Sequence, residues 1–447
     1  MPPAQSAEGE TKGETSLGRL GRRMLTALFG AAPFLATVFP RGTPFCLLLF
    51  ALKGAPLAWR NPSALKADLF APVTLSLAAF AGLALLSAGW SPTPERALLK
   101  GALLLLLCGV SLLAAQLRTG VAADRVDELA AAIGAGIGVG LAFIAFETLT
   151  GRYLTRLVFT HMPAVQAIYA GKHLGIGHGG VFLGDTLVNR ATCVATVLLI
   201  PGLLLAKRYY TERGFRLFAA TAAVFTLCVL LFSRHQSSQI ALLVAIVVGL
   251  LAWRYLGATK KTLIVLWSAA VLLAPFGAYV MGKTGLEDAP WLFNTAKQRV
   301  AIWQSVAERI EQHPLLGAGA TAGELPMRVD LTPIEAGPSK QPSAMSARHP
   351  HDIYLQVWYE LGLAGVLLLL LFGWSVFRCI ESLARDAQPY ALALFGLTAI
   401  MAATSYGLWQ FWFQCLLALG FVTASLARAR SAAARVGAGA AGARRSF

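Results

Sequence analysis

The chain has 447 residues, of which 56% are hydrophobic and only 13% are charged, and its mean hydropathy is +0.62. Soluble globular proteins carry about 25% charged residues, and no polar block here is large enough to fold alone, so the composition excludes a soluble multidomain protein. The net charge of +16 fits the basic cytoplasmic loops of a membrane protein, and without a basic, aromatic-interleaved soluble domain the sequence argues against nucleic acid as a partner.

The N-terminal segment, residues 1–21, is polar and rich in Glu, Ser and Gly. It is predicted to be a disordered cytoplasmic terminus. Arg22 and Arg23 then precede an apolar run, as they would in a secretory signal. No small-residue cleavage site follows and further apolar runs come at once, so this run is expected to be retained as the first helix.

Residues 22–427 hold about twelve apolar runs of the length that a helix needs to cross a membrane, roughly 17–25 residues. The runs cover 24–40, 43–59, 69–89, 98–117, 129–149, 190–206, 215–232, 238–256, 262–281, 353–377, 389–404 and 407–427. We therefore predict an all-α integral membrane protein whose residues 22–427 form one polytopic membrane domain.

Basic residues set the expected orientation, because short cytoplasmic loops collect Lys and Arg. They cluster at alternate ends of the runs, for example at Lys207-Arg208, and again in the basic C-terminal tail, residues 428–447. With these ends inside, both termini are cytoplasmic. Two long segments, at about 151–189 and 281–352, then fall on the outer, periplasmic side.

The segment 281–352 is the largest polar block, and it contains one predicted amphipathic helix. From Ala296 to His313, apolar side chains recur at helical spacing. Pro314 follows directly, and Gly317 and Gly319 come soon after, which is a helix stop signal.

The six cysteines lie in or beside apolar runs, and none is paired at metal-ligand spacing. We expect small buried side chains, with no disulfide framework and no zinc site. Because no carboxylate cluster or metal-binding motif occurs elsewhere, neither a metal nor a cofactor is predicted.

Two histidines precede the run at 353–377. His349 and His351 are followed by Asp352, which could cap the helix N-terminus and so hold His351 at the membrane surface. Histidine can act as a general base near neutral pH. The alternative is a pair of interfacial side chains that are merely solvated.

Three arginines fall on the same predicted side. Arg234 lies between two apolar runs, where a charge is expensive and marks a candidate functional site unless it snorkels to the headgroups. Arg190 supports the same interpretation more weakly, and Arg299 could simply be a solvated side chain of the amphipathic helix. Arginine binds phosphates through a planar fork of donors. The surface therefore suits a lipid-linked pyrophosphate, with a histidine beside it to deprotonate an acceptor hydroxyl.

These motifs resemble the signature of the O-antigen ligase and polymerase family. His351-Asp352-Ile353-Tyr354-Leu355, with Gly362 after six more residues, is similar to a pattern in which His, usually followed by Asn, Ser or Gly, precedes a Leu and later a Gly. The helix that begins near Gln298-Arg299 and leads into Pro314-x-x-Gly317-x-Gly319 is similar to another family segment. Ser233-Arg234 with small polar residues after it is similar again.

The resemblance covers about residues 185–370 and implies a C-type, metal-independent membrane glycosyltransferase. Such enzymes take a glycan from undecaprenyl pyrophosphate at the periplasmic face of the inner membrane of a Gram-negative bacterium, and the ligases move it to lipid A–core. Matched onto this sequence, the resemblance implies that His351 is catalytic and that substrate is bound by Arg190, Arg234, Arg299 and His349. Asp352 stands where the family more often has Asn, which leaves the local hydrogen bonding open.

An O-antigen or exopolysaccharide polymerase is the main alternative to an O-antigen ligase, because both use the same donor and differ only in the acceptor. A polysaccharide transporter or flippase predicts charged or broken helices at the midplane and internal repeats, whereas the polar residues here gather at one face. A non-enzymatic scaffold leaves Arg234 unexplained. We therefore expect a glycan ligase in contact with membrane lipids.

Overall fold

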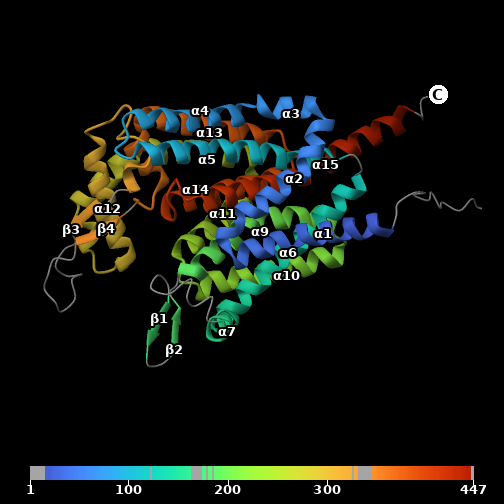
Figure 1. The fold of residues 1–447 in the computed structure, drawn as a ribbon, viewed down its shortest axis with the longest axis horizontal. Coiled ribbons are helices and arrows are strands. Elements are labelled where there is room, and N and C mark those ends of the chain that lie inside the picture. Colours follow the sequence, from blue (N-terminus) through green and yellow to red (C-terminus); the bar gives the residue numbers. More distant parts are fainter. Residues whose placement is uncertain are drawn as a thin grey trace, which may run out of the picture.

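The structure, a computed structural model, describes residues 16–120, 123–162, 174–177, 180–183, 186–324, 327–330, 344–347 and 349–443. Within these ranges the chain is a bundle of long helices with two short β-hairpins (Figure 1). The predicted fold class, a helical multi-pass membrane protein, is confirmed.

The helices follow one another along the chain. They are α1 (Ser16–Val38), α2 (Thr43–Arg60), α3 (Pro62–Leu69), α4 (Pro72–Leu86), α5 (Pro94–Ala115), α6 (Ala123–Leu149), α7 (Tyr153–His161), α9 (Thr186–Tyr209), α10 (Glu212–Phe232), α11 (Gln236–Lys283), α12 (Asn294–Ile310), α13 (Ile353–Glu381), α14 (Gln388–Thr404) and α15 (Phe411–Ala443). The connections between α7 and α9 and between α12 and α13 are long.

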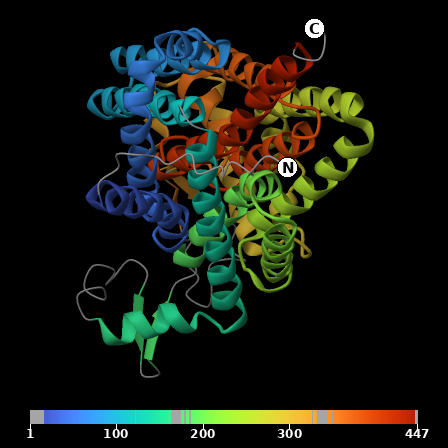
Figure 2. The same ribbon diagram turned by 90° about the vertical axis from the view of Figure 1, so that its right-hand side faces the viewer.

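The two hairpins lie in the two long polar segments. Strands β1 (Leu174–Gly177) and β2 (Gly180–Leu183) pair antiparallel, with Leu174 opposite Leu183. Strands β3 (Met327–Asp330) and β4 (Ala344–Ala347) do the same, with Met327 opposite Ala347. Figure 2 shows α7, β1 and β2 standing off the helix bundle, and Figure 1 shows α12, β3 and β4 together at one end of it.

The described residues include eight helices long and apolar enough to cross a membrane, at Pro40–Arg60, Pro72–Gly89, Pro94–Thr119, Val126–Leu149, Val188–Tyr209, Glu212–Phe232, Gln236–Lys283 and Ile353–Glu381. Two apolar helices, Gln388–Thr404 and Phe411–Ala427, are shorter. The sequence prediction of about twelve also counts α1, and it divides α11 in two. Backbone angles are non-helical at Tyr255 within α11, near the end of the first of the two spans predicted there.

The chain ends differ in part from the prediction. Helix α1 begins at Ser16, so residues 16–21 of the segment expected to be disordered are helical. The fifteen residues before them lie outside the described residues. At the other end, α15 continues to Ala443, so most of the basic tail extends the last helix.

Helix α9 is the centre of the bundle. Its most apolar 18 residues, within Val188–Tyr209, are 78% buried, the highest share among the candidate spans of the described chain. It packs against α6, α10, α14 and α15. Arg190 in its first turns is therefore fixed on a rigid element that reaches into the middle of the molecule.

The predicted amphipathic helix is confirmed as α12, Asn294–Ile310. Its side chains Val300, Val306 and Ile310 are buried, and its apolar face packs against α11 and α13. Because α12 is packed on this face, its N-terminal half, with Arg299, has a fixed position beside the start of α13.

Helix α13 is broken at Gly362, where φ is +60° and ψ is −158°. A regular helix would pair the carbonyls of Tyr359 and Glu360 with the amides of Leu363 and Ala364. The turn that follows α12 replaces these lost bonds. Its amides at Ala318 and Gly319 donate to Tyr359 and Glu360 (both 2.9 Å), and its carbonyls at Pro314 and Leu315 accept from Leu363 (2.9 Å) and Ala364 (3.1 Å).

The close approach of this turn explains its glycines. Gly319 has a φ of +92°, and a Cβ there would lie 2.4 Å from the Cα of Ser91. Ser87 and Ser91 bind the next residue, Ala320: Ser87 Oγ accepts from its amide at 2.9 Å, and Ser91 Oγ donates to its carbonyl at 2.8 Å. The turn thus joins the connection between α4 and α5 to the broken part of α13.

We expect Gly319→Ala to lower the free energy of unfolding by about 1–3 kcal/mol through overpacking, with strain at positive φ adding to this loss. Thermal unfolding of the purified protein in detergent measures the effect. Gly82→Ala in α4 is the matched control, because a Cβ there meets nothing within 4 Å, and alanine favours the helix. Equal stability of the two variants would contradict the account of the turn.

Candidate functional site

Four segments that are far apart in the sequence meet beside the N-terminus of α13. Arg299 of α12 lies close enough to His235, His349 and His351 to contribute to a lowered pKa of all three imidazoles, after the larger effect of burial. Tyr406, from the connection between α14 and α15, lies within electrostatic range of the same arginine. The structure therefore brings the predicted histidines and Arg299 into one cluster.

His351 is held in a single tautomer by its neighbour. Its Nδ1 lies 2.8 Å from the carbonyl oxygen of Ser405. Because a carbonyl can only accept, Nδ1 carries the proton and Nε2 keeps its lone pair. Burial lowers the pKa of His351, the hydrogen bond to Ser405 opposes this shift, and Arg299 adds to it. At neutral pH the imidazole is thus a neutral group with a basic Nε2.

The backbone of His351 is strained, with a φ of +55°, which costs on the order of 1–2 kcal/mol in a residue with a side chain. Contacts on both sides hold it there. Trp303 of α12 donates to the carbonyl of Pro350 at 2.8 Å. Asp352 caps α13, because its Oδ1 accepts from the amides of Tyr354 (2.7 Å) and Leu355 (3.1 Å).

His349 packs its ring against that of His351, with centroids 4.2 Å apart. Its Nδ1 accepts from the backbone amide of His351 at 3.3 Å, and its Nε2 lies 3.1 Å from the side-chain nitrogen of Gln410. Burial, together with His351 and Arg299, lowers the pKa of His349 to about 3. Because its Nδ1 already accepts a hydrogen bond inside the protein, His349 is the poorer base of the two.

Arg190 lies at one side of this cluster, against aromatic rings. Its guanidinium carbon is 5.9 Å from the ring centroid of Trp412, and the Tyr406 ring lies 4.8 Å from the same indole. Burial raises the pKa of Tyr406 well above its ordinary value, so its hydroxyl stays protonated and can donate a hydrogen bond. The site thus combines cationic and neutral donors with one basic imidazole nitrogen.

Arg234 is placed differently from the other predicted residues. It is exposed, in the short connection between α10 and α11. Its neighbour His235 turns inward instead, with its ring 6.1 Å from that of Tyr406 and its Nδ1 2.6 Å from Ser238 Oγ. Burial and Arg299 lower the pKa of His235 to about 4. The structure therefore puts Arg234 at the edge of the site rather than within the cluster.

Sequence reasoning missed three residues of this site: His235, Tyr406 and Trp412. A signal for the last two was present, because polar and aromatic residues crowd the segment from Tyr406 to Gln414. Most of that segment falls at the start of the apolar span predicted at 407–427. For His235 the only signal was its place beside Arg234.

The chain is similar to known proteins over part of its length. Residues 221–370 match the family model described as O-Antigen ligase. The chain is 30% identical over 120 residues to the protein named "Putative polysaccharide ligase RC0486" of Rickettsia conorii, over 26% of this chain and 28% of that protein. It is also 30% identical over 144 residues to the protein named "Putative polysaccharide ligase" of Rickettsia bellii, over 32% of this chain and 35% of the relative.

These matches confirm the resemblance that the motifs indicated. The alignments span about a third of the length of these two relatives or less. The matched segment contains His235, Arg299, His349 and His351, whereas Arg190 and Tyr406 lie outside the family match.

Proposed function

Because residues 221–370 match the O-antigen ligase family, we propose that this protein is an O-antigen ligase. It transfers a glycan from undecaprenyl pyrophosphate to a lipid A–core acceptor at the periplasmic face of the inner membrane. The observation that carries the proposal is the cluster itself: a neutral imidazole, fixed with Nε2 as a base, beside two partly buried arginines at the end of a membrane-spanning bundle.

In the proposed reaction, His351 Nε2 takes the proton of an acceptor hydroxyl while that oxygen attacks the anomeric carbon of the glycan. The bond between the anomeric carbon and the pyrophosphate oxygen breaks. Its electron pair leaves with undecaprenyl pyrophosphate, and the proton stays on His351 until solvent removes it. Positioned proton transfer of this kind contributes about 10²–10⁴-fold to a rate.

The arginines bind and stabilise the pyrophosphate in this scheme. Arg299 and Arg190 are rooted in helices, so their positions are set before substrate arrives, which is the condition for electrostatic stabilisation of a leaving group. Arg234, exposed at the edge, contacts the donor as it approaches from the lipid. His349 supports the His351 ring and borders the same substrate site.

A deletion strain of the source bacterium tests the function. We expect its lipopolysaccharide gel to show unsubstituted core, with polymerised glycan retained on the lipid carrier. Core bearing a single repeat unit would instead identify a polymerase, which uses the same donor with a growing glycan as acceptor. A wild-type ladder on lipid A–core in the deletion strain would overturn the proposal.

A further inference from the structure

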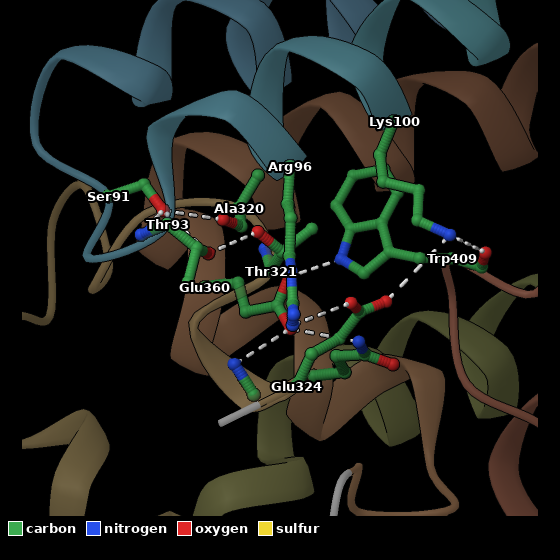
Figure 3. Close-up of polar contacts among 11 residues, drawn as sticks. Ser91, Thr93, Arg96, Lys100, Ala320, Thr321, Glu324, Glu360 and Trp409 are labelled. Atoms are coloured by element: carbon green, nitrogen blue, oxygen red, sulfur yellow. Dashed lines mark hydrogen bonds and ion pairs between the residues drawn. The ribbon is translucent and has the colours of Figure 1, made fainter.

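Glu360 is a fully buried carboxylate in α13, with 0% of its surface exposed. It lies among residues of three other segments, the connection before α5, the turn after α12 and the connection between α14 and α15 (Figure 3). A buried charge is costly unless its oxygens are satisfied. The reaction proposed above makes no use of this carboxylate.

Among the described residues, the Glu360 carboxylate has four hydrogen-bond partners, and each is an N–H group. Oε2 accepts from the amide of Thr321 at 2.8 Å and from the indole Nε1 of Trp409. Oε1 accepts from the amide of Gly323 at 3.2 Å and from Gln356 Nε2 at 2.9 Å. Both oxygens therefore act only as acceptors, which an amide in the same place cannot reproduce.

Two of these bonds lead to the site loop, which we define as residues 405–410 between α14 and α15. Trp409 binds Glu360 directly. Gln356 binds Glu360 through its Nε2 and accepts from the amide of Leu408 at 2.7 Å through its Oε1. On the other side of Trp409, its carbonyl accepts from Lys100 Nζ at 3.1 Å. Hydrogen bonds thus hold two adjacent residues of the loop: Leu408 and Trp409 are bound to side chains of α13, and Trp409 is also bound to α5.

The same site loop holds both histidines. The carbonyl of Ser405 at its start accepts from His351 Nδ1 at 2.8 Å. Gln410 at its end lies 3.1 Å from His349 Nε2. The tautomer and direction of the His351 ring therefore depend on where this loop stands.

We propose that Glu360 is a positioning residue for glycan transfer: through Trp409 and Gln356 it holds the site loop so that Ser405 keeps His351 in its basic tautomer. This inference rests on the proposed function of His351 as the base. Glu360 touches no substrate in this scheme. Its effect is on the geometry of proton transfer, where a displacement of about 1 Å can cost about 10²-fold in rate.

The test compares Glu360→Gln with a buried carboxylate that is hydrogen-bonded to α7 rather than to the site loop. Glutamine has the same shape, but its NH₂ group faces two N–H donors, so about half of the bonds are lost. Glu147→Gln is the control, since Glu147 is 1% exposed and accepts from the amides of Leu154 (2.8 Å) and Thr155 (3.1 Å). Both changes disturb a buried, multiply bonded carboxylate.

For each purified variant we would measure kcat and the donor KM of in vitro transfer. We would also measure the rate at which diethyl pyrocarbonate modifies His351, resolved from His349 by peptide mass spectrometry. In Glu360→Gln we expect kcat to fall about 10²-fold with an unchanged donor KM, and His351 to be modified several-fold faster. In Glu147→Gln we expect wild-type values of all three.

Trp409→Phe is the second variant, because it removes one N–H donor and keeps an aromatic ring. It should show the same pattern more weakly, with kcat about tenfold lower, and it decides the question if Glu360→Gln does not fold. The proposal is overturned if Trp409→Phe, and any Glu360→Gln protein that folds, keep the wild-type kcat and the wild-type rate of His351 modification. It is also overturned if Glu147→Gln loses as much kcat as Glu360→Gln. If the wild-type protein transfers no glycan while His351 modification still responds to Glu360→Gln, the proposed function fails, and only the control of the His351 ring position by Glu360 stands.

Discussion

Replacing His351 with alanine is expected to lower the rate of glycan transfer by about 10²–10⁴-fold, the usual contribution of a positioned general base. Donor binding should persist, because the arginines remain. The acceptor hydroxyl is a weak nucleophile, and His351 Nε2 is the nitrogen that the contact from Nδ1 to Ser405 leaves basic. The measurement is in vitro transfer by purified protein, with binding of the lipid donor determined separately.

Two neighbouring variants serve as controls for this assignment. Asp352→Asn should stay active, because asparagine also caps a helix and the Asp352 carboxylate oxygen Oδ1 is already bound to the amides of α13. His349→Ala should lose less than His351→Ala. A wild-type rate in His351→Ala combined with an inactive Asp352→Asn would move the base to the carboxylate.

Replacing Arg299 with alanine should reduce kcat by about 10²–10³-fold, the typical loss when one preorganised donor to a developing negative charge is removed. Arg299→Lys should restore only part of this rate, since lysine keeps the charge but not the planar fork. The same steady-state transfer assay, run with saturating acceptor, measures both variants. Full activity in Arg299→Ala would show that the donor pyrophosphate is bound elsewhere.

The pH dependence of the transfer rate in these variants distinguishes a role of Arg299 in donor binding from its effect on the pKa of His351. The base form of His351 is neutral, so transfer is constant above its pKa and falls below it. Burial and, to a smaller extent, Arg299 lower that pKa, and the wild-type rate should therefore hold to below pH 6.5, about the ordinary histidine value. Arg299→Ala removes one cause of the lowering, so its acid limb should move to higher pH. Arg299→Lys keeps the charge and should keep the wild-type limb.

The parts of the fold that were predictable are those set by local pattern. Apolar runs located the helices, because only a helix or a closed barrel satisfies its backbone in lipid. Helical periodicity and the stop signal at His313-Pro314 located α12 to within three residues at each end. The order of His351, Asp352 and an apolar run was enough to place the histidine just before a helix.

The parts that were not predictable depend on contacts between distant segments. The turn between α10 and α11 decides whether Arg234 or His235 faces inward. Because both residues are polar, the sequence pattern does not distinguish them. Glu360 looked like an ordinary residue of an apolar helix until the turn at Thr321 and the indole of Trp409 were placed beside it. No spacing rule connects groups that are about 40 residues or more apart in the chain.

The break in α13 at Gly362 has a consequence for the order in which the protein is made. Until the turn at 314–319 docks, the two carbonyls and two amides at the break have no partners, and each such group costs several kcal/mol in hydrocarbon. The turn precedes α13 in the chain, so it has already left the ribosome when α13 is synthesised. If that turn must also cross the membrane before α13 inserts, translocation of the segment after α11 is the step that makes α13 stable. A shortened segment would then be cleared by membrane proteases rather than accumulate as an inactive enzyme.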